Sequence, residues 1–159
     1  MSEADAPERP ALRALLVEDS RLDAELLRVQ LERAQPGVRL EVLREEAAFV
    51  DALHTGAWDV ILSDYELPGF TGSDLLDHRN RLAPGTPFIF VSGVIGEDNA
   101  VELLKRGATD YVSKHRMERL APVLERALRE VEERRARELA ERQLHHAGQR
   151  FARVVDGLR

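Results

Sequence analysis

Residues 60–72, with the sequence VILSDYELPGFTG, form the most informative segment of the chain. It begins with an apolar run, Val60 to Leu62, which is typical of a buried strand. Asp64 follows the run, and a proline and two glycines after it predict a turn. In an open α/β sheet, ligands bind in the crevice outside the carboxyl ends of the strands. The sequence therefore predicts that this strand delivers the Asp64 carboxylate to such a crevice.

Strand and helix patterns alternate on both sides of this stretch. Short apolar runs predict strands over residues 12–17 and 88–91, and a further short strand is expected over residues 110–113. Residues 38–43 alternate between apolar and charged side chains, which predicts a strand with one more polar face. Helical spacing predicts helices from Ser20 to about Gln35 and over residues 47–53, 73–82 and 97–106, with a last helix from about Arg116. Such alternation favours parallel strands with right-handed crossovers. We expect an α/β fold: a five-stranded parallel sheet with helices on both faces, and residues 38–43 toward its edge.

The composition excludes several classes of function. The chain has 159 residues and a net charge of −6, which disfavours binding to nucleic acid or to anionic membranes because both need a basic surface. It has no cysteine, so disulfides and thiolate metal sites are excluded. No apolar run approaches the ~20 residues of a membrane span. We expect a cytoplasmic protein that contacts neither nucleic acid nor membrane.

Polar residues follow four of the predicted strands. They are Glu18 and Asp19, Asp64, Ser92, and Lys114. Carboxylates held close together repel one another unless a cation joins them, and Mg²⁺ suits oxygen ligands beside a phosphoryl group. A phosphoryl group on Asp64 would meet the metal, the Lys114 ammonium and the Ser92 hydroxyl. Charge stabilisation of this kind is most of what phosphoryl transfer requires, so the predicted chemistry is an aspartyl-phosphate.

At these residues the chain resembles the receiver domain of two-component response regulators. The resemblance covers roughly Leu12 to Val131, which predicts a receiver domain over residues 11–131. It rests on the acidic pair, the spacing from Asp64 to the following proline and glycine, Ser92-Gly93, and Tyr111 three residues before Lys114. It implies a flavodoxin-like fold and phosphorylation of Asp64 by a histidine kinase or phosphotransfer protein. Beyond assisting its own phosphorylation and dephosphorylation, such a domain is not an enzyme.

The resemblance also implies roles for the other residues of the site. Mg²⁺ would be bound by Asp19, Asp64 and the backbone carbonyl of Glu66, with Glu18 acting through water. Ser92 and Tyr111 would form the switch that follows the phosphoryl group.

Two departures from the family pattern are visible. His115 follows Lys114 where the family has proline, so the customary cis-proline turn is not expected. Glu66 and Val94 stand at positions that influence access of the hydrolytic water, and the phosphate lifetime does not follow from them.

The chain outside residues 11–131 has a different character. Residues 1–10 are expected to be a disordered lead-in. In residues 132–159, charged residues are followed by apolar positions spaced four and three apart: Ala140, Leu144, Ala147, Phe151, Val154 and Leu158. This heptad predicts a coiled-coil signalling helix and a homodimer, either parallel or antiparallel, with a register break within residues 132–139. QRFARVVDGL, residues 149–158, resembles the lead-in to a PAS domain, which would make the end of the chain the start of a truncated output domain.

Other functions remain open from the sequence. A haloacid-dehalogenase-like phosphatase would use Asp64 as nucleophile, but it needs a second aspartate where Glu66 stands. A phosphate-independent dimerisation adapter with a vestigial receiver site is the alternative to the phosphoacceptor. The five histidines show no metal-ligand spacing.

Overall fold

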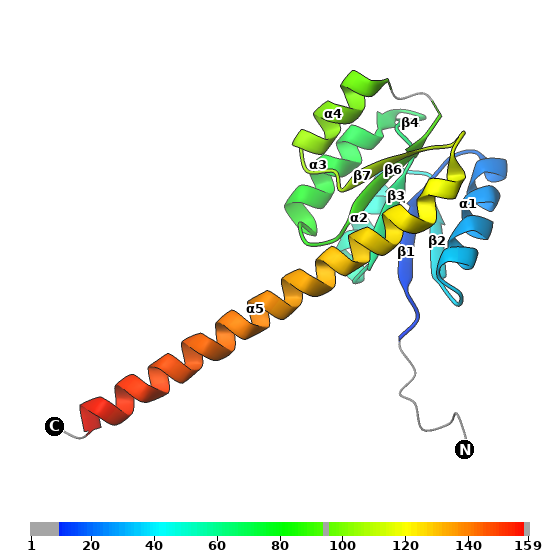
Figure 1. Ribbon diagram of the computed structural model, residues 1–159. Helices are drawn as coiled ribbons and strands as arrows, with labels where there is room; N and C mark the ends of the chain where they lie inside the picture. The colour runs from blue at the N-terminus through cyan, green and yellow to red at the C-terminus, as the bar shows by residue number, and fades with distance from the viewer. Residues whose placement is uncertain (1–9, 94–95, 158–159) are drawn as a thin grey trace, which may run out of the picture.

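The computed structural model describes residues 10–93 and 96–157, and side chains as far as Gln149 (Figure 1). A single parallel sheet contains β1 (Arg13–Val17), β2 (Arg39–Leu43), β3 (Val60–Ser63), β6 (Phe88–Ser92) and β7 (Asp110–Ser113). The strand order is β2-β1-β3-β6-β7, so β2 lies at the edge of the sheet. The alternation of apolar and charged side chains in residues 38–43 predicts this position. The expected five-stranded, flavodoxin-like sheet is confirmed.

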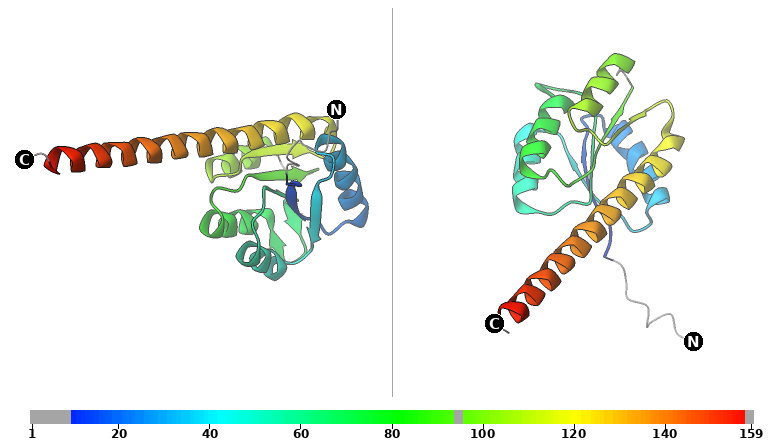
Figure 2. Two further views of the ribbon diagram at one scale, coloured as in Figure 1. Left: turned by 90° about the horizontal axis from the view of Figure 1, so that it is seen from below. Right: turned by 60° about the vertical axis from the view of Figure 1, so that its left-hand side comes forward.

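Five α-helices accompany the sheet in the described part of the chain. They are α1 (Arg21–Ala34), α2 (Glu46–Thr55), α3 (Gly72–Leu82), α4 (Glu97–Lys105) and α5 (Leu120–Gly157), the last preceded by a 3₁₀ turn at Met117–Arg119. The expected bounds agree with these to within a few residues at most ends. Figure 2 shows α1 and α5 on one side of the sheet and the other helices on the opposite side.

Two cores form because successive strand residues point to opposite faces of the sheet. In β1, Leu16 packs with Leu27 of α1 and Leu124 of α5, whereas Leu15 packs with Phe49 of α2 and Leu75 of α3. Both faces are covered, so all four residues of β3 are buried. This burial explains why residues 60–72 begin with an uninterrupted apolar run.

The segment after Asp64 has more structure than the predicted turn. β4 (Glu66–Leu67) and β5 (Phe70–Thr71) form a two-stranded antiparallel hairpin. Gly69 sits between them at φ +86°, a backbone conformation that glycine adopts without steric cost. The hairpin returns the chain to the end of β3, where α3 begins.

α5 extends well beyond the sheet (Figures 1 and 2). Its first turns pack on the sheet through Leu120, Val123, Leu124 and Ala127, and from Glu132 to Gln149 every side chain is exposed. The predicted heptad residues Phe151, Val154 and Leu158 lie outside the described side chains, as the lead-in at residues 1–9 lies outside the described chain. Within the described residues, no helix has the length and apolarity needed to cross a bilayer.

Candidate functional site

The polar residues predicted to converge are positioned by the ends of adjacent parallel strands. The backbone N–H of Asp64 donates to the carbonyl of Val17 at 3.0 Å, which places Asp64 next to Glu18. The N–H of Lys114 likewise donates to the carbonyl of Ser92 at 3.1 Å. These backbone bonds continue the sheet register by one residue, so the site residues are held by the sheet itself.

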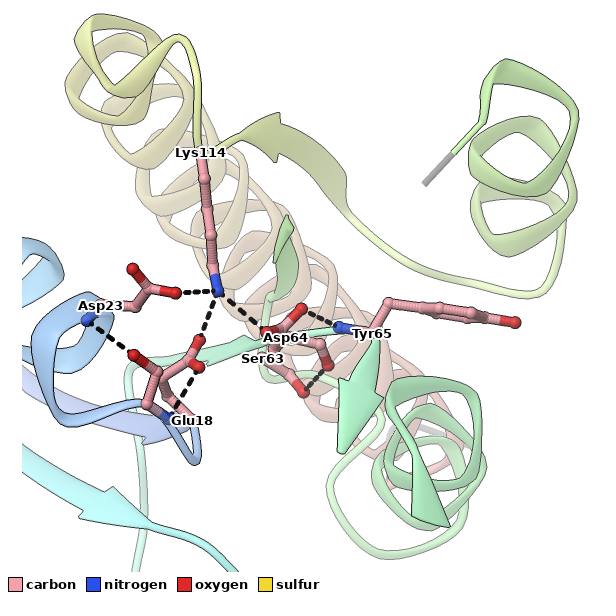
Figure 3. Close-up of polar contacts among 7 residues, drawn as sticks. Glu18, Asp23, Ser63, Asp64, Tyr65 and Lys114 are labelled. Carbon is pink, nitrogen blue, oxygen red and sulfur yellow. Dashed lines mark hydrogen bonds and ion pairs between the residues drawn. The ribbon is translucent and has the colours of Figure 1, made fainter. Parts of the chain in front are cut away.

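The Lys114 ammonium lies at the centre of the site (Figure 3). Its Nζ is 2.9 Å from Glu18 Oε2, 2.9 Å from Asp23 Oδ2 and 2.9 Å from Asp64 Oδ2. Glu18 and Asp64 are buried, with 1% and 9% of their surfaces exposed. One cation therefore bridges three carboxylates that come from β1, α1 and β3.

The Asp64 carboxylate is oriented by two different partners. Its Oδ1 accepts a hydrogen bond from the backbone N–H of Tyr65 at 2.7 Å, and its Oδ2 accepts one from Lys114 at 2.9 Å. The Ser63 hydroxyl donates to the Asp64 carbonyl at 2.7 Å. The side chain is thus fixed at the mouth of the sheet before any ligand arrives.

The charges in the site shift the pKa values of two groups. Burial alone would lower the pKa of Lys114, but the carboxylates of Asp23, Asp64 and Glu18 outweigh it and raise that pKa. Burial raises the pKa of Glu18, while the Lys114 ammonium and the hydrogen bond from the Ser20 N–H oppose the shift. Lys114 is therefore firmly a cation.

A group of acidic side chains at this mouth matches the donor set of a hard cation. Glu18, Asp19 and Asp64 can each offer one carboxylate oxygen, and these oxygens lie within 4.8 Å of one another. Asp19 is exposed, so the group opens toward solvent. Oxygen donors around an open position suit Mg²⁺, which keeps several waters and binds through one or two carboxylates.

The remaining predicted residues lie around this centre. Ser92 is fully buried at the end of β6, and Tyr111, paired with Phe90 in the sheet, is partly buried against the second core. Glu66 is exposed in β4. Lys114 and His115 are joined by a trans peptide bond, as expected without the proline. Val94 lies outside the described residues.

Asp23 is the site residue that sequence reasoning missed. Its pattern with Ser20 predicts only a helix start, and that start is confirmed: the Ser20 hydroxyl accepts a hydrogen bond from the Asp23 N–H at 3.2 Å. The side chain also reaches Lys114, 91 residues away in sequence. The sequence places Asp23 close to the acidic pair at the end of β1, but the direction of its side chain cannot be deduced from that position.

Comparison with known proteins agrees with this geometry. Residues 14–125 match the family described as the response regulator receiver domain. The chain belongs to this family. Receiver domains are signalling domains of two-component systems, and their partners are histidine kinases or phosphotransfer proteins.

Individual relatives extend the likeness. The cell cycle response regulator CtrA of Brucella ovis is 31% identical over 114 residues, which are 70% of this chain and 48% of that protein. The chain thus spans about half the length of the curated relatives it matches. A signal receiver domain from Vibrio parahaemolyticus is 25% identical with a TM-score of 0.73, covering 81% of this chain and 98% of that one.

A third similar protein is described with a bound metal. It is the receiver domain of the sensor histidine kinase PA1611 from Pseudomonas aeruginosa, with a magnesium ion coordinated in its active site cleft. It has a TM-score of 0.65 and 22% identity, covering 75% of this chain and 98% of that one, and it supports the shared fold.

Proposed function

We propose that this receiver domain is a phosphoacceptor and that Asp64 takes the phosphoryl group from a histidine kinase or phosphotransfer protein. The observation that supports this most strongly is the contact of the Lys114 ammonium with Asp64, 2.9 Å apart, beside the acidic group of Glu18 and Asp19. A carboxylate that could act as nucleophile, a cation, and acidic side chains that could hold a metal lie together at the carboxyl ends of the strands. Phosphoryl transfer needs these parts.

The reaction follows from the side chains present. An oxygen of the Asp64 carboxylate attacks the phosphorus of a phosphohistidine; a P–O bond forms, the P–N bond breaks, and the imidazole nitrogen takes up a proton. The Lys114 ammonium stabilises the negative charge on the phosphoryl oxygens. Glu18, Asp19, Asp64 and the Glu66 backbone carbonyl would hold Mg²⁺, which when bound neutralises part of that charge.

We infer that Ser92 and Tyr111 relay the state of Asp64. Ser92 ends β6 beside Lys114, and Tyr111 lies on the neighbouring strand in register with Phe90. A phosphoryl group on Asp64 would draw the Ser92 hydroxyl toward it, and Tyr111 would move inward. Because Lys114 directly precedes the turn into α5, the change would pass to the long helix and to a homodimer formed through it.

The proposal is tested by the mass of the intact chain after incubation with acetyl phosphate. We expect a gain of one phosphoryl group in the presence of Mg²⁺, none after chelation of Mg²⁺, and none in Asp64→Asn. Asp51→Asn is the matched control, because Asp51 is an exposed aspartate on α2 whose carboxylate makes no hydrogen bond or ion pair with the residues that the structure describes. Label in Asp64→Asn equal to that in the wild type would contradict the assignment.

The same samples distinguish the alternative function. Light scattering before and after phosphorylation reports the oligomeric state. A dimer that forms without any uptake of phosphoryl groups would favour the phosphate-independent adapter over the phosphoacceptor.

A further inference from the structure

The Lys114 ammonium donates hydrogen bonds to Asp23 and Asp64 and forms an ion pair with Glu18. An ammonium group offers three donors and no acceptor, and Nζ lies 2.9 Å from each of Glu18, Asp23 and Asp64. Figure 3 shows Asp23 approaching from α1, on the side of the ammonium away from Asp64. The ammonium thus lies between the first turn of α1, which carries Asp23, and the end of β3, which is followed by Asp64.

Asp23 differs from the other two partners in what else it does. Glu18 and Asp64 both belong to the acidic group that fits a metal ion, whereas Asp23 is not in that group. Asp64 is in addition the proposed phosphoacceptor. Asp23 is therefore the partner whose carboxylate stays available to Lys114 when the other two are engaged.

The position of Asp23 is itself fixed by the start of α1. Glu18 Oε1 accepts a hydrogen bond from the Ser20 N–H at 3.2 Å, and the Ser20 hydroxyl accepts one from the Asp23 N–H at 3.2 Å. These bonds connect the end of β1 to the first turn of α1. The Asp23 side chain is 35% exposed, so its geometry depends on this backbone anchoring rather than on close packing.

We propose that Asp23 is a positioning residue that holds the Lys114 ammonium over Asp64 during phosphoryl transfer. The inference rests on the proposed function, and it assigns to α1 a direct part in the chemistry. Asp23 does not touch the reacting atoms; it acts through Lys114. An ammonium that is already oriented stabilises the developing charge without first having to be ordered.

Asp23→Asn tests the proposal with little structural change. The amide has nearly the same size, and the backbone N–H that Ser20 caps is retained. We expect phosphorylation by acetyl phosphate to slow on the order of tenfold. The maximal rate should fall, while the acetyl phosphate concentration that gives half-maximal rate should stay the same. Asp23→Glu, which restores the charge, should recover part of the rate.

Glu25→Gln is the matched control. Glu25 lies on α1, is exposed, and forms an ion pair with Arg28 at 3.4 Å. Glu25→Gln removes one negative charge from the same helix as Asp23→Asn does. It therefore controls for any effect of net charge on the reaction with acetyl phosphate, which is itself negatively charged. We expect its rate to equal that of the wild type.

A double-mutant cycle with Lys114→Gln separates positioning from a general effect on the helix. If Asp23 acts through Lys114, Asp23→Asn changes neither the phosphorylation rate nor the melting temperature further once Lys114 is replaced. The melting temperature in Mg²⁺ provides a readout that does not depend on phosphorylation.

The outcomes are distinct. Asp23→Asn with the wild-type rate overturns this inference and leaves the proposed function standing. A slow Asp23→Asn whose effect persists in full on top of Lys114→Gln also overturns it, because the effect would then come from the start of α1. A wild-type chain that takes up no phosphoryl group overturns both proposals.

Discussion

The Lys114 ammonium is surrounded by more carboxylates than it can neutralise. The carboxylates of Glu18, Asp19, Asp23 and Asp64 gather there, and three of them contact the single ammonium. Like charges held close raise the cost of ionisation unless a cation offsets them. Lys114 alone therefore does not balance these charges, and a divalent cation that bound here would compete with it for Glu18 and Asp64.

Lys114→Met should strengthen Mg²⁺ binding. The substitution removes the competing ammonium, and unit charges about 4 Å apart interact by about 1 kcal/mol in water and about 4 kcal/mol near a protein surface, so a gain of roughly tenfold in affinity is expected. Isothermal titration calorimetry measures it. Lys105→Met, at the exposed end of α4, is the control for net charge. Weaker binding in Lys114→Met would show that the ammonium does not compete with the metal.

Removal of the same ammonium should also lower the melting temperature of the Mg²⁺-free chain, because Glu18 is left buried without its cation. Differential scanning calorimetry in chelator tests this. An unchanged melting temperature would mean that the ion pairs contribute nothing to the stability of the metal-free state.

Glu18 should make stability depend on pH. Burial raises its pKa above the ordinary value of 4.5, so the folded chain binds this proton more tightly than the unfolded chain. The contribution of Glu18 to the free energy of unfolding therefore falls as the pH rises from 4.5 through the folded-state pKa, and Glu18→Gln removes that fall. Thermal unfolding of both proteins in Mg²⁺-free buffer, compared across this window, measures the difference. Parallel curves would contradict the shift.

At the scale of elements, the loop after Asp64 is held by a close approach of α3 to the end of β3. The N–H of Gly72 donates to the carbonyl of Tyr65 at 2.7 Å. A Cβ added at Gly72 would lie 2.5 Å from Phe90 Cε1 and 2.6 Å from the Asp64 carbonyl oxygen. The position therefore accepts no side chain unless the backbone that carries Asp64 shifts.

Gly72→Ala should destabilise the domain by about 1–3 kcal/mol through overpacking. The general preference of helices for alanine over glycine, about 1 kcal/mol, acts in the opposite direction and does not remove the clash. Urea unfolding measures the change. Gly85→Ala is the control, because a Cβ there meets nothing within 4 Å. A Gly72→Ala chain as stable as the Gly85→Ala chain would contradict this account of the loop.

Most elements could be predicted because their signals are local. Buried strands such as β3 are short apolar runs, and the end of α4 is marked by Gly107 at φ +113°. The apolar face of α1 was less predictable: Leu27 and Leu31 are buried, but Leu22 is 71% exposed. Apolar residues surround much of this helix, and its periodicity alone does not identify the side that packs on the sheet.

The site was predictable only in part. Residues at strand ends could be placed together because parallel strands bring their carboxyl ends to one edge. The ion pair of Asp23 with Lys114 could not, because it joins a helix to a loop across the sheet and depends on side-chain direction. Binding of Mg²⁺, phosphorylation and switching at Ser92 and Tyr111 stay predictions.

At the scale of the whole molecule, α5 has two parts with different surroundings. Leu120 and Leu124 are buried in the first core, whereas Leu139 and Leu144 are 53% and 76% exposed. Leu144 stands with Ala140 and Ala147 at the predicted heptad positions, all three are exposed, and an exposed apolar stripe of this kind is typical of a surface that pairs with another helix. A second copy of α5 is the expected partner.

Truncation after Arg134 should therefore convert a dimer into a monomer. The residues of α5 that pack on the sheet all precede this point, so the domain should keep its melting temperature. Light scattering coupled to size-exclusion chromatography measures the mass. In the full chain, Leu144→Asp should weaken the dimer, and Glu141→Gln, an exposed substitution on the same stretch, should not. A truncated chain that remains dimeric would move the interface to the globular part.

The proposed function requires Asp64 to be the residue that carries the phosphoryl group. Reduction of the acetyl phosphate-treated chain with borohydride converts a phosphorylated aspartate to homoserine, and tandem mass spectrometry of the peptide spanning β3 to α3 locates it. We predict homoserine at position 64, dependent on Mg²⁺. Homoserine at position 19, 23 or elsewhere, with Asp64 intact, would contradict the central claim.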